Sequence, residues 1–291
     1  LVLGGGGARG AAHISIIKKL ESLQIPIDCI AGTSMGALIG GLYASGMTSS
    51  ELEEMIKTLN WPVLLNDTVP RQERSFRRKQ DDTLSLAPAR PGIGKGGLKL
   101  PSGILAGENI LFFLTQKSGN SAGIADFNQL SIPFRAVAAD INTGKAAVLG
   151  FGSLPMAMRA SMSIPGAFKP ISIDGQLLVD GGMVNQVPID VVRAMGADIV
   201  IAVDVGTPLA VIDDQSSILA IGNQVTGFLT VGNTDASVAT LTEKDVLIRP
   251  QLGDDVTTTS FDPEKIALAL AIGEEAAILA SDRLAVLSEP S

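Results

Sequence analysis

A serine flanked by glycines lies between a short apolar run and a helical pattern. Gly32-Thr33-Ser34-Met35-Gly36 matches the motif G-x-S-x-G. In this motif a sharp strand-to-helix turn lifts the serine out of the chain, and the glycines two residues to either side allow the turn without a Cβ clash. The N-terminus of the following helix favours negative charge at the serine. The pattern predicts that Ser34 is a nucleophile, and the alternative is a plain tight turn in a glycine-rich buried unit.

A nucleophilic serine needs a base that accepts its proton. The chain has one histidine, His13, and it precedes the serine, whereas the hydrolase triad has the order serine, acid, histidine. Asp180, followed by Gly181 and Gly182, is a candidate carboxylate because the two glycines leave it little steric cover. An Asp-Gly turn explains the same residues without any chemistry. Either Ser34 is not a nucleophile, or a carboxylate takes its proton directly.

A run of glycines follows the first apolar residues and begins a helical pattern, Gly5-Gly6-Gly7-Ala8-Arg9-Gly10. Consecutive N–H groups in such a loop can face an anion. One use is an oxyanion hole for an acyl carbonyl. The other is dinucleotide binding, because Gly5, Gly7 and Gly10 match G-x-G-x-x-G. That interpretation requires an acidic residue at the end of the next strand, and Asp28 precedes the apolar part of that strand.

The composition excludes several classes of protein. The 291 residues are 46% hydrophobic and 18% charged, which is incompatible with global disorder. The net charge of −8 argues against a nucleic-acid partner, because a nucleic-acid binder carries a basic surface. One cysteine, Cys29, and one histidine exclude an intramolecular disulfide and the multi-cysteine and multi-histidine metal centres. We expect no metal.

The elements that must position these residues alternate along the chain. Hydrophobic periodicity predicts strands over 1–3, 27–31, 134–139, 176–179, 198–203 and 246–248. It predicts helices over 11–23, 35–46, 50–59, 153–162, 188–195, 216–242 and 263–287. Ser50 and Glu53 are expected to form a capping box. Strands separated by helices favour an α/β fold with a mostly parallel sheet and helices on both faces.

We expect one domain over residues 1–291. Residues 66–127 change in character and are predicted to form a cap or insertion, and residues 263–288 a helical C-terminal segment. Residues 29–50 carry no charge, which raises a membrane span as an alternative. The glycine-serine turn inside that stretch favours a buried strand, turn and helix instead.

Together the three motifs resemble the patatin-like phospholipase family. The similarity comprises Gly-Gly-Gly-x-Arg-Gly at 5–10, Gly-x-Ser-x-Gly at 32–36 and Asp-Gly-Gly at 180–182, in the family's order. It covers roughly residues 1–250. The resemblance implies a three-layer α/β/α fold and a lipid acyl hydrolase of the phospholipase A type, with a Ser–Asp dyad and no cofactor or metal. A dyad also accounts for the missing histidine.

The resemblance implies a role for each motif residue. Ser34 is the nucleophile that forms an acyl-serine intermediate, and Asp180 is the general base. The N–H groups of Gly5, Gly6 and Gly7 form the oxyanion hole.

Other residues of the motifs are expected to support the site. Arg9 is expected to order the glycine loop and to take no part in proton transfer. For His13 a structural role is favoured over a catalytic one. The remaining supporting residues are Gly32, Gly36, Gly181 and Gly182.

A lipid substrate requires an apolar cleft and a surface that meets lipid. The apolar segment at 104–114 is expected to line the cleft or to cap it, with ordinary core packing as the alternative. The one basic run contains the candidate headgroup contacts Arg74, Arg77 and Arg78, with a solvated charged face as the alternative. The expected partners are a phospholipid or other acyl ester and a transient membrane surface. A homodimer is a further candidate partner, because an apolar stripe on the C-terminal helix can support contact between two copies.

The middle segment resembles bacterial members of the family, in particular secreted passengers attached to outer-membrane β-barrels. This resemblance implies a secreted or cell-surface protein, with a cytoplasmic one as the alternative. Two other function classes stay open. One is a dinucleotide-binding oxidoreductase that uses the glycine loop, and the other is a catalytically silent lipid-binding module of the same fold.

Overall fold

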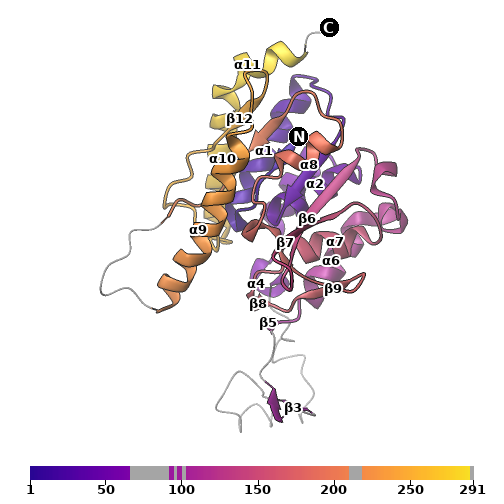
Figure 1. The fold of residues 1–291 in the computed structure, drawn as a ribbon. Coiled ribbons are helices and arrows are strands. Elements are labelled where there is room, and N and C mark those ends of the chain that lie inside the picture. The colour runs from indigo at the N-terminus through magenta and orange to yellow at the C-terminus, as the bar shows by residue number, and fades with distance from the viewer. Residues whose placement is uncertain (66–91, 95–96, 100–102, 210–217, 289–291) are drawn as a thin grey trace.

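A mostly parallel sheet forms the centre of the protein (Figure 1). The computed structural model describes residues 1–65, 92–94, 97–99, 103–209 and 218–288. The strands of this sheet are β1 (Val2–Leu3), β2 (Ile30–Thr33), β6 (Phe134–Asp140), β7 (Lys145–Leu149), β9 (Ile171–Ile173), β10 (Gln176–Asp180), β11 (Ile201–Val203) and β12 (Val246–Ile248). Their order is β12-β11-β1-β2-β6-β10-β9, and β7 also pairs with β6.

The direction of pairing changes at β6. All pairs from β12 through β11, β1 and β2 to β6 are parallel. The pairs of β6 with β7 and with β10, and of β10 with β9, are antiparallel. Two small sheets lie outside the central one. They are β3 (Gly92–Gly94) with β4 (Gly97–Lys99), and β5 (Gly103–Leu105) with β8 (Gly166–Phe168).

Helices cover both faces of the sheet, which makes three layers. The helices are α1 (Ala12–Ser22), α2 (Met35–Ala44), α3 (Ser49–Thr58), α4 (Trp61–Leu64), α6 (Glu108–Ser118), α7 (Leu154–Ser161), α8 (Ile189–Ala194), α9 (Ile218–Val238), α10 (Pro263–Leu279) and α11 (Ser281–Ala285). Short 3-10 turns are η1 (Gly7–Ala11), η2 (Gly119–Gly123), η3 (Phe127–Gln129), η4 (Gly181–Met183) and η5 (Val286–Ser288).

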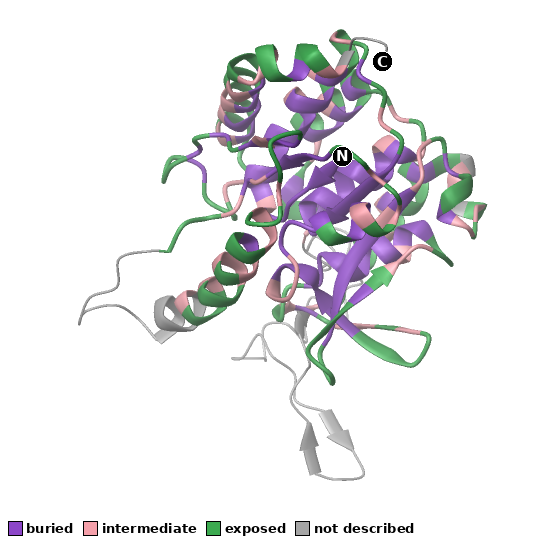
Figure 2. Cartoon of the chain, turned by 45° about the horizontal axis from the view of Figure 1, so that its top comes forward, coloured by how far each residue is buried: buried purple, intermediate pink, exposed green. Residues whose placement is uncertain are grey.

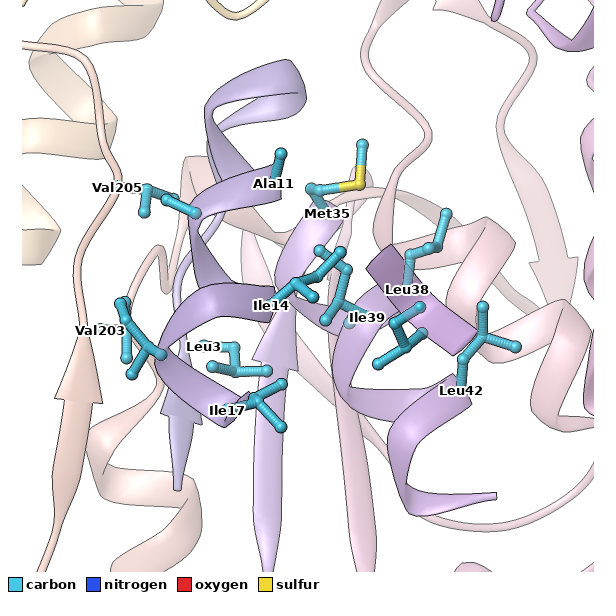
Figure 3. Packing of buried hydrophobic residues seen from close by; sticks show 14 of the residues in the cluster. Leu3, Ala11, Ile14, Ile17, Met35, Leu38, Ile39, Leu42, Val203 and Val205 are labelled. Atoms are coloured by element: carbon cyan, nitrogen blue, oxygen red, sulfur yellow. The ribbon is translucent and has the colours of Figure 1, made fainter. Parts of the chain in front are cut away.

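Alternate residues of the strands pack into separate cores. Leu3 of β1 lies in the core with α1, α2 and α10, whereas its neighbour Val2 lies in the core with α8 and the end of α9. This alternation follows from the two-residue period of a strand. Figure 3 shows the first core, in which side chains of β1 and β11 meet those of α1 and α2. The expected α/β/α architecture is therefore confirmed.

The uncharged stretch at 29–50 is protein core. All four residues of β2 are buried, and so is most of α2, which shows as purple ribbon at the centre of Figure 2. Among the helices that the structure describes, none combines the length and the apolar character needed to cross a membrane.

Half of the predicted cap at 66–127 falls outside the described residues, which lack 66–91, 95–96 and 100–102. Within its described part, Ile110 and Leu114 of α6 are fully buried in the first core. Phe112 between them is 66% exposed. For Ile110 and Leu114, core packing is therefore the right interpretation.

The predicted capping box is wrong by two residues. Thr48 Oγ1 accepts the N–H of Glu51 at 3.2 Å, and the Glu51 carboxylate accepts the N–H of Thr48 at 2.8 Å. Threonine and serine are both residue types that cap helices. Thr48 and Ser50 are each followed by a glutamate three residues later, so the capping-box motif fits both positions.

Candidate active site

The serine turn joins the end of β2 to the start of α2. Ser34 has φ 53° and ψ −121°, a positive φ that non-glycine residues adopt only at a cost. The turn brings the first residues of α2 against the end of β1. A Cβ on Gly36 would lie 2.1 Å from the carbonyl oxygen of Leu3, so only glycine fits there. The turn thus has the strained strand-to-helix form that a nucleophilic serine requires.

Ser34 and Asp180 are hydrogen-bonded to each other. Ser34 Oγ donates to Asp180 Oδ2 at 2.6 Å, and the N–H of Gly182 donates to Asp180 Oδ1 at 2.8 Å. Asp180 is the last residue of β10, and only β6 separates β10 from β2 in the sheet. The two side chains are 7% and 8% exposed. The structure therefore brings together the predicted nucleophile and the predicted carboxylate.

The glycines after Asp180 allow a close approach to the neighbouring strand. A Cβ on Gly181 would lie 2.1 Å from the carbonyl oxygen of Val137 in β6. Ser161 of α7 also bonds this part of β6, because its hydroxyl donates to the Val137 carbonyl. The same hydroxyl accepts the N–H of Ser34 at 2.9 Å. Ser161 thus fixes the backbone of the serine turn, a role that no motif in the sequence indicated.

The glycine loop offers fewer free N–H groups than expected. The N–H of Gly5 donates to the backbone carbonyl of Gln186 at 3.1 Å, so Gly5 is not available as an oxyanion donor. The Gln186 side chain in turn donates from Nε2 to the Gly5 carbonyl at 2.8 Å. The N–H groups of Gly6 and Gly7 have no acceptor among the described residues. Gln186 is a second site residue that the sequence did not indicate, since its partner lies 181 positions away.

Comparison with known proteins identifies the family. The sequence model of the patatin-like phospholipase family matches residues 1–193. The chain belongs to this family. The match ends before the approximate limit of 250 that the motifs suggested.

Several relatives share the patatin-like segment. An uncharacterized NTE family protein of Mycobacterium bovis is 37% identical over 203 residues, which are 70% of this chain and 48% of the relative. Patatin-like phospholipase domain-containing protein 6 of Homo sapiens is 33% identical over 209 residues, which are 71% of this chain and 13% of the relative. The chain therefore spans about half or less of the length of these curated relatives.

A solved structure shows the same patatin-like fold. VipD from Legionella pneumophila superimposes with a TM-score of 0.53 at 16% sequence identity. The comparison covers 96% of this chain and 66% of VipD. At this identity the likeness concerns the fold alone.

Burial brings the pKa of the Asp180 carboxyl closer to neutral pH. Removal from water raises the pKa of Asp180 from 3.8 to about 6. The hydrogen bonds from Ser34 and Gly182 favour the ionised form and oppose this shift. At pH 7 Asp180 is therefore mostly ionised, but it binds a proton far more readily than an ordinary aspartate. This is the property that a general base requires.

Hydrolysis of an ester by this chain is expected to rise with pH through an apparent pKa of about 6. Protonated Asp180 cannot accept the Ser34 proton, so activity should fall about tenfold for each pH unit below that value. The measurement is kcat/KM for a soluble ester between pH 4.5 and 8. A rate that stays flat down to pH 4.5 would show that Asp180 is not the base.

Arg9 bonds to backbone and not to the dyad. Its guanidinium donates to the carbonyls of Val205 at 2.8 Å, Val256 at 2.7 Å, Gly253 at 2.8 Å and Gly206 at 3.1 Å. The side chain is 3% exposed. This arrangement ties the glycine loop to two distant segments, as a loop-ordering residue does.

His13 lies in the core next to the glycine loop. It is fully buried, and its Nε2 lies 2.8 Å from the Gly4 carbonyl, which requires the Nε2-protonated tautomer. Its Nδ1 has no hydrogen-bond partner among the described residues. The Ser34 hydroxyl donates to Asp180 instead. Burial lowers the pKa of His13 from 6.5 to about 4, so in the folded protein it is neutral above that pH.

His13→Gln is expected to reduce the acid sensitivity of the fold. Between pH 6.5 and 4 the unfolded chain binds a proton at His13 that the folded chain does not, so stability falls as the pH falls through this window. The loss integrates to about 3 kcal/mol. Glutamine can still donate to Gly4 but does not titrate. Urea denaturation at pH 7 and pH 4 should therefore show a smaller loss for the variant; equal losses would contradict this account.

One sequence expectation lies outside the part of the chain that the structure describes, and the structure argues against another. The candidate headgroup contacts Arg74, Arg77 and Arg78 lie outside the described residues. The dinucleotide interpretation needs an acidic residue at the end of the second strand, but β2 ends at Thr33 and leads directly into the serine turn. The geometry therefore favours the oxyanion interpretation of the glycine loop.

Proposed function

We propose that this chain is a lipid acyl hydrolase of the phospholipase A type that works through a Ser34–Asp180 dyad. The hydrogen bond of 2.6 Å between Ser34 Oγ and Asp180 Oδ2 carries the proposal, because it joins a nucleophile on a strained turn to a carboxylate with a raised pKa. Membership of the patatin-like phospholipase family supports a lipid ester as the substrate. So does the name of the human relative, a patatin-like phospholipase domain-containing protein.

The reaction proceeds in two steps on the serine. Ser34 Oγ attacks the ester carbonyl carbon while Asp180 accepts the hydroxyl proton. Collapse of the tetrahedral intermediate breaks the ester C–O bond, and Asp180 returns the proton to the leaving alcohol. Water then attacks the acyl carbon while Asp180 accepts its proton, and the acyl C–Oγ bond breaks as Asp180 returns that proton to Ser34 Oγ. The products are a free fatty acid and a lysophospholipid, and Ser34 is regenerated.

The charge on the tetrahedral oxygen needs donors that are free and fixed in advance. The N–H groups of Gly6 and Gly7 have no protein acceptor among the described residues, whereas that of Gly5 is bonded to Gln186. Gly6 and Gly7 are therefore the oxyanion donors in this proposal. The bonds of Gln186 to Gly5 hold the preceding peptide of the loop in place.

The experiment that tests the function measures both products of one cleavage. The chain is incubated with mixed micelles of phosphatidylcholine and detergent, and the lipids are analysed by mass spectrometry. We expect free fatty acid and lysophosphatidylcholine in equal amounts. The absence of both products, with a folded protein, would rule out a phospholipase A activity on this lipid.

Secretion and dimerisation stay predictions from the sequence.

A further inference from the structure

One end of α9 stands away from the body of the protein (Figure 1), and exposed residues lie along the helix (Figure 2). Val225, Phe228 and Leu229 are 55%, 55% and 48% exposed. No charged residue occurs from Ile218 to Thr234. Single exposed apolar residues are ordinary, but a contiguous uncharged group of them marks an interaction surface. We call Val225, Phe228 and Leu229 the α9 apolar face.

The α9 apolar face is continuous with the candidate active site. Asn233, farther along the same helix, donates from Nδ2 to the carbonyl of Gly182 at 2.9 Å. Its Oδ1 accepts the N–H of Gln186 at 2.8 Å. Residues four apart on a helix are neighbours on its surface, so Leu229 lies one turn of about 5.4 Å from Asn233 and Val225 lies one further turn away. The face thus begins at the Asp-Gly-Gly turn and leads away from it.

Asn233 itself faces the protein, and so do residues beside it on the helix. Thr230, Val231 and Thr234 help to line a cavity of about 370 Å³ that Arg9 and Gln186 also line. Neither residue of the dyad lines this cavity. This side of α9 therefore faces the protein, and the α9 apolar face stays exposed among the residues that the structure describes.

A fourth exposed apolar residue lies in the loop between α7 and β8. Ile164 is 48% exposed and directly follows Ser163, whose carbonyl accepts the N–H of Asp180 at 2.9 Å. Two parts of the chain that carry exposed apolar residues, α9 and the loop after α7, are therefore hydrogen-bonded to the segment around Asp180.

We propose that the α9 apolar face docks the protein onto a lipid layer and so brings the Ser34–Asp180 dyad to the esters below the lipid headgroups. The inference rests on the proposed function, because a lipid ester reaches a buried dyad only if the protein meets the interface. An uncharged apolar helix side that leads from the catalytic turn is suited to insertion between acyl chains. Because the net charge of the chain is −8, anionic lipid does not attract the protein as a whole. Binding therefore depends on the insertion of apolar side chains into the lipid layer.

Vesicle binding tests this surface without using catalysis. The probe is vesicles of ether-linked phosphatidylcholine, which have no ester to cleave. The double variant Val225→Asp with Phe228→Asp is compared with the control Ile278→Asp with Leu279→Asp on α10, where both side chains are also exposed, at 59% and 80%. In flotation assays we expect the α9 variant to bind at least about tenfold more weakly, since losing the burial of one large apolar side chain has that effect. The control should bind like the unmutated chain.

A second measurement covers the case in which the α9 variant does not fold. An environment-sensitive fluorophore is attached at Phe228→Cys or, as the control, at Leu279→Cys; the native Cys29 is buried. Vesicles should shift the emission to the blue at position 228 and not at 279. No shift at 228, or equal losses of binding in both aspartate variants, would overturn the proposal.

The same experiments separate a lipid layer from a second copy of the chain. A dimer that becomes a monomer in the α9 variant, with vesicle binding unchanged, would make the face an interface between copies and would overturn the proposal. Because ether lipids cannot be hydrolysed, a failure of the proposed hydrolase is seen separately, as missing fatty acid from ordinary phosphatidylcholine.

Discussion

Ser34→Ala is expected to lower ester hydrolysis by at least about 10⁴-fold, because the variant has no nucleophile to form the acyl intermediate. The fold should survive, since alanine is smaller than serine and the turn is held by the Ser34 N–H bond to Ser161. The measurement is kcat/KM for a soluble ester, with circular dichroism to follow the fold. Activity within about tenfold of the unmutated chain would place the nucleophile elsewhere.

Ser34→Gly is the matched control for the backbone of the turn. It removes the hydroxyl as alanine does, so it should be equally inactive. Glycine adopts φ 53° and ψ −121° without the steric cost that alanine has. The glycine variant should therefore be more stable than the alanine variant by about 1 kcal/mol in urea denaturation. An alanine variant of equal or greater stability would mean that the turn stores no strain.

Asp180→Asn is expected to lower ester hydrolysis by about 10³-fold while leaving the protein folded. Asparagine matches aspartate in volume and can still accept one of the hydrogen bonds that Ser34 and Gly182 donate. It cannot take a proton from Ser34 or from the deacylating water. The assay is the same as for Ser34. Near-normal activity in this variant would refute the dyad.

The same substitution is expected to stabilise the fold above pH 6. Burial raises the pKa of Asp180 from 3.8 to about 6, so the folded chain holds a proton in this window that the unfolded chain has lost. The stability of the unmutated chain therefore falls as the pH rises through the window, by about 3 kcal/mol in total. Asparagine does not titrate. The stability advantage of Asp180→Asn should grow from pH 4 to pH 6 and then level off in urea denaturation.

Local patterns predicted the parts of the site that are close together in sequence. The turn at Ser34 follows from the two glycines beside it, and β2 and α2 lie on either side of it as expected. The parallel part of the central sheet was predictable, because its buried strands alternate with helices along the chain. The strands β7, β8 and β9 were missed; β7 and β9 pair antiparallel in the central sheet, and β8 pairs in parallel with β5. They are short and at most partly buried, so their periodicity is weak.

Contacts between distant segments were not predictable from spacing. The bonds of Gln186 to Gly5 and of Asn233 to Gly182 join positions 181 and 51 residues apart, and neither residue belongs to a motif. A further bond between these distant segments, from the Gly5 N–H to the Gln186 carbonyl, occupies one of the glycine amides. The sequence could therefore indicate a three-glycine oxyanion hole but could not show that the Gly5 N–H is already bonded.

The activated serine is tested most directly by intact-mass spectrometry after treatment with a fluorophosphonate, which reacts with activated serines. The unmutated chain, Ser34→Ala and Asp180→Asn are treated side by side. The dyad predicts a single adduct on the unmutated chain, none on Ser34→Ala and a much slower adduct on Asp180→Asn. No adduct on the folded unmutated chain, or an adduct that persists in Ser34→Ala, would contradict a Ser34–Asp180 hydrolase.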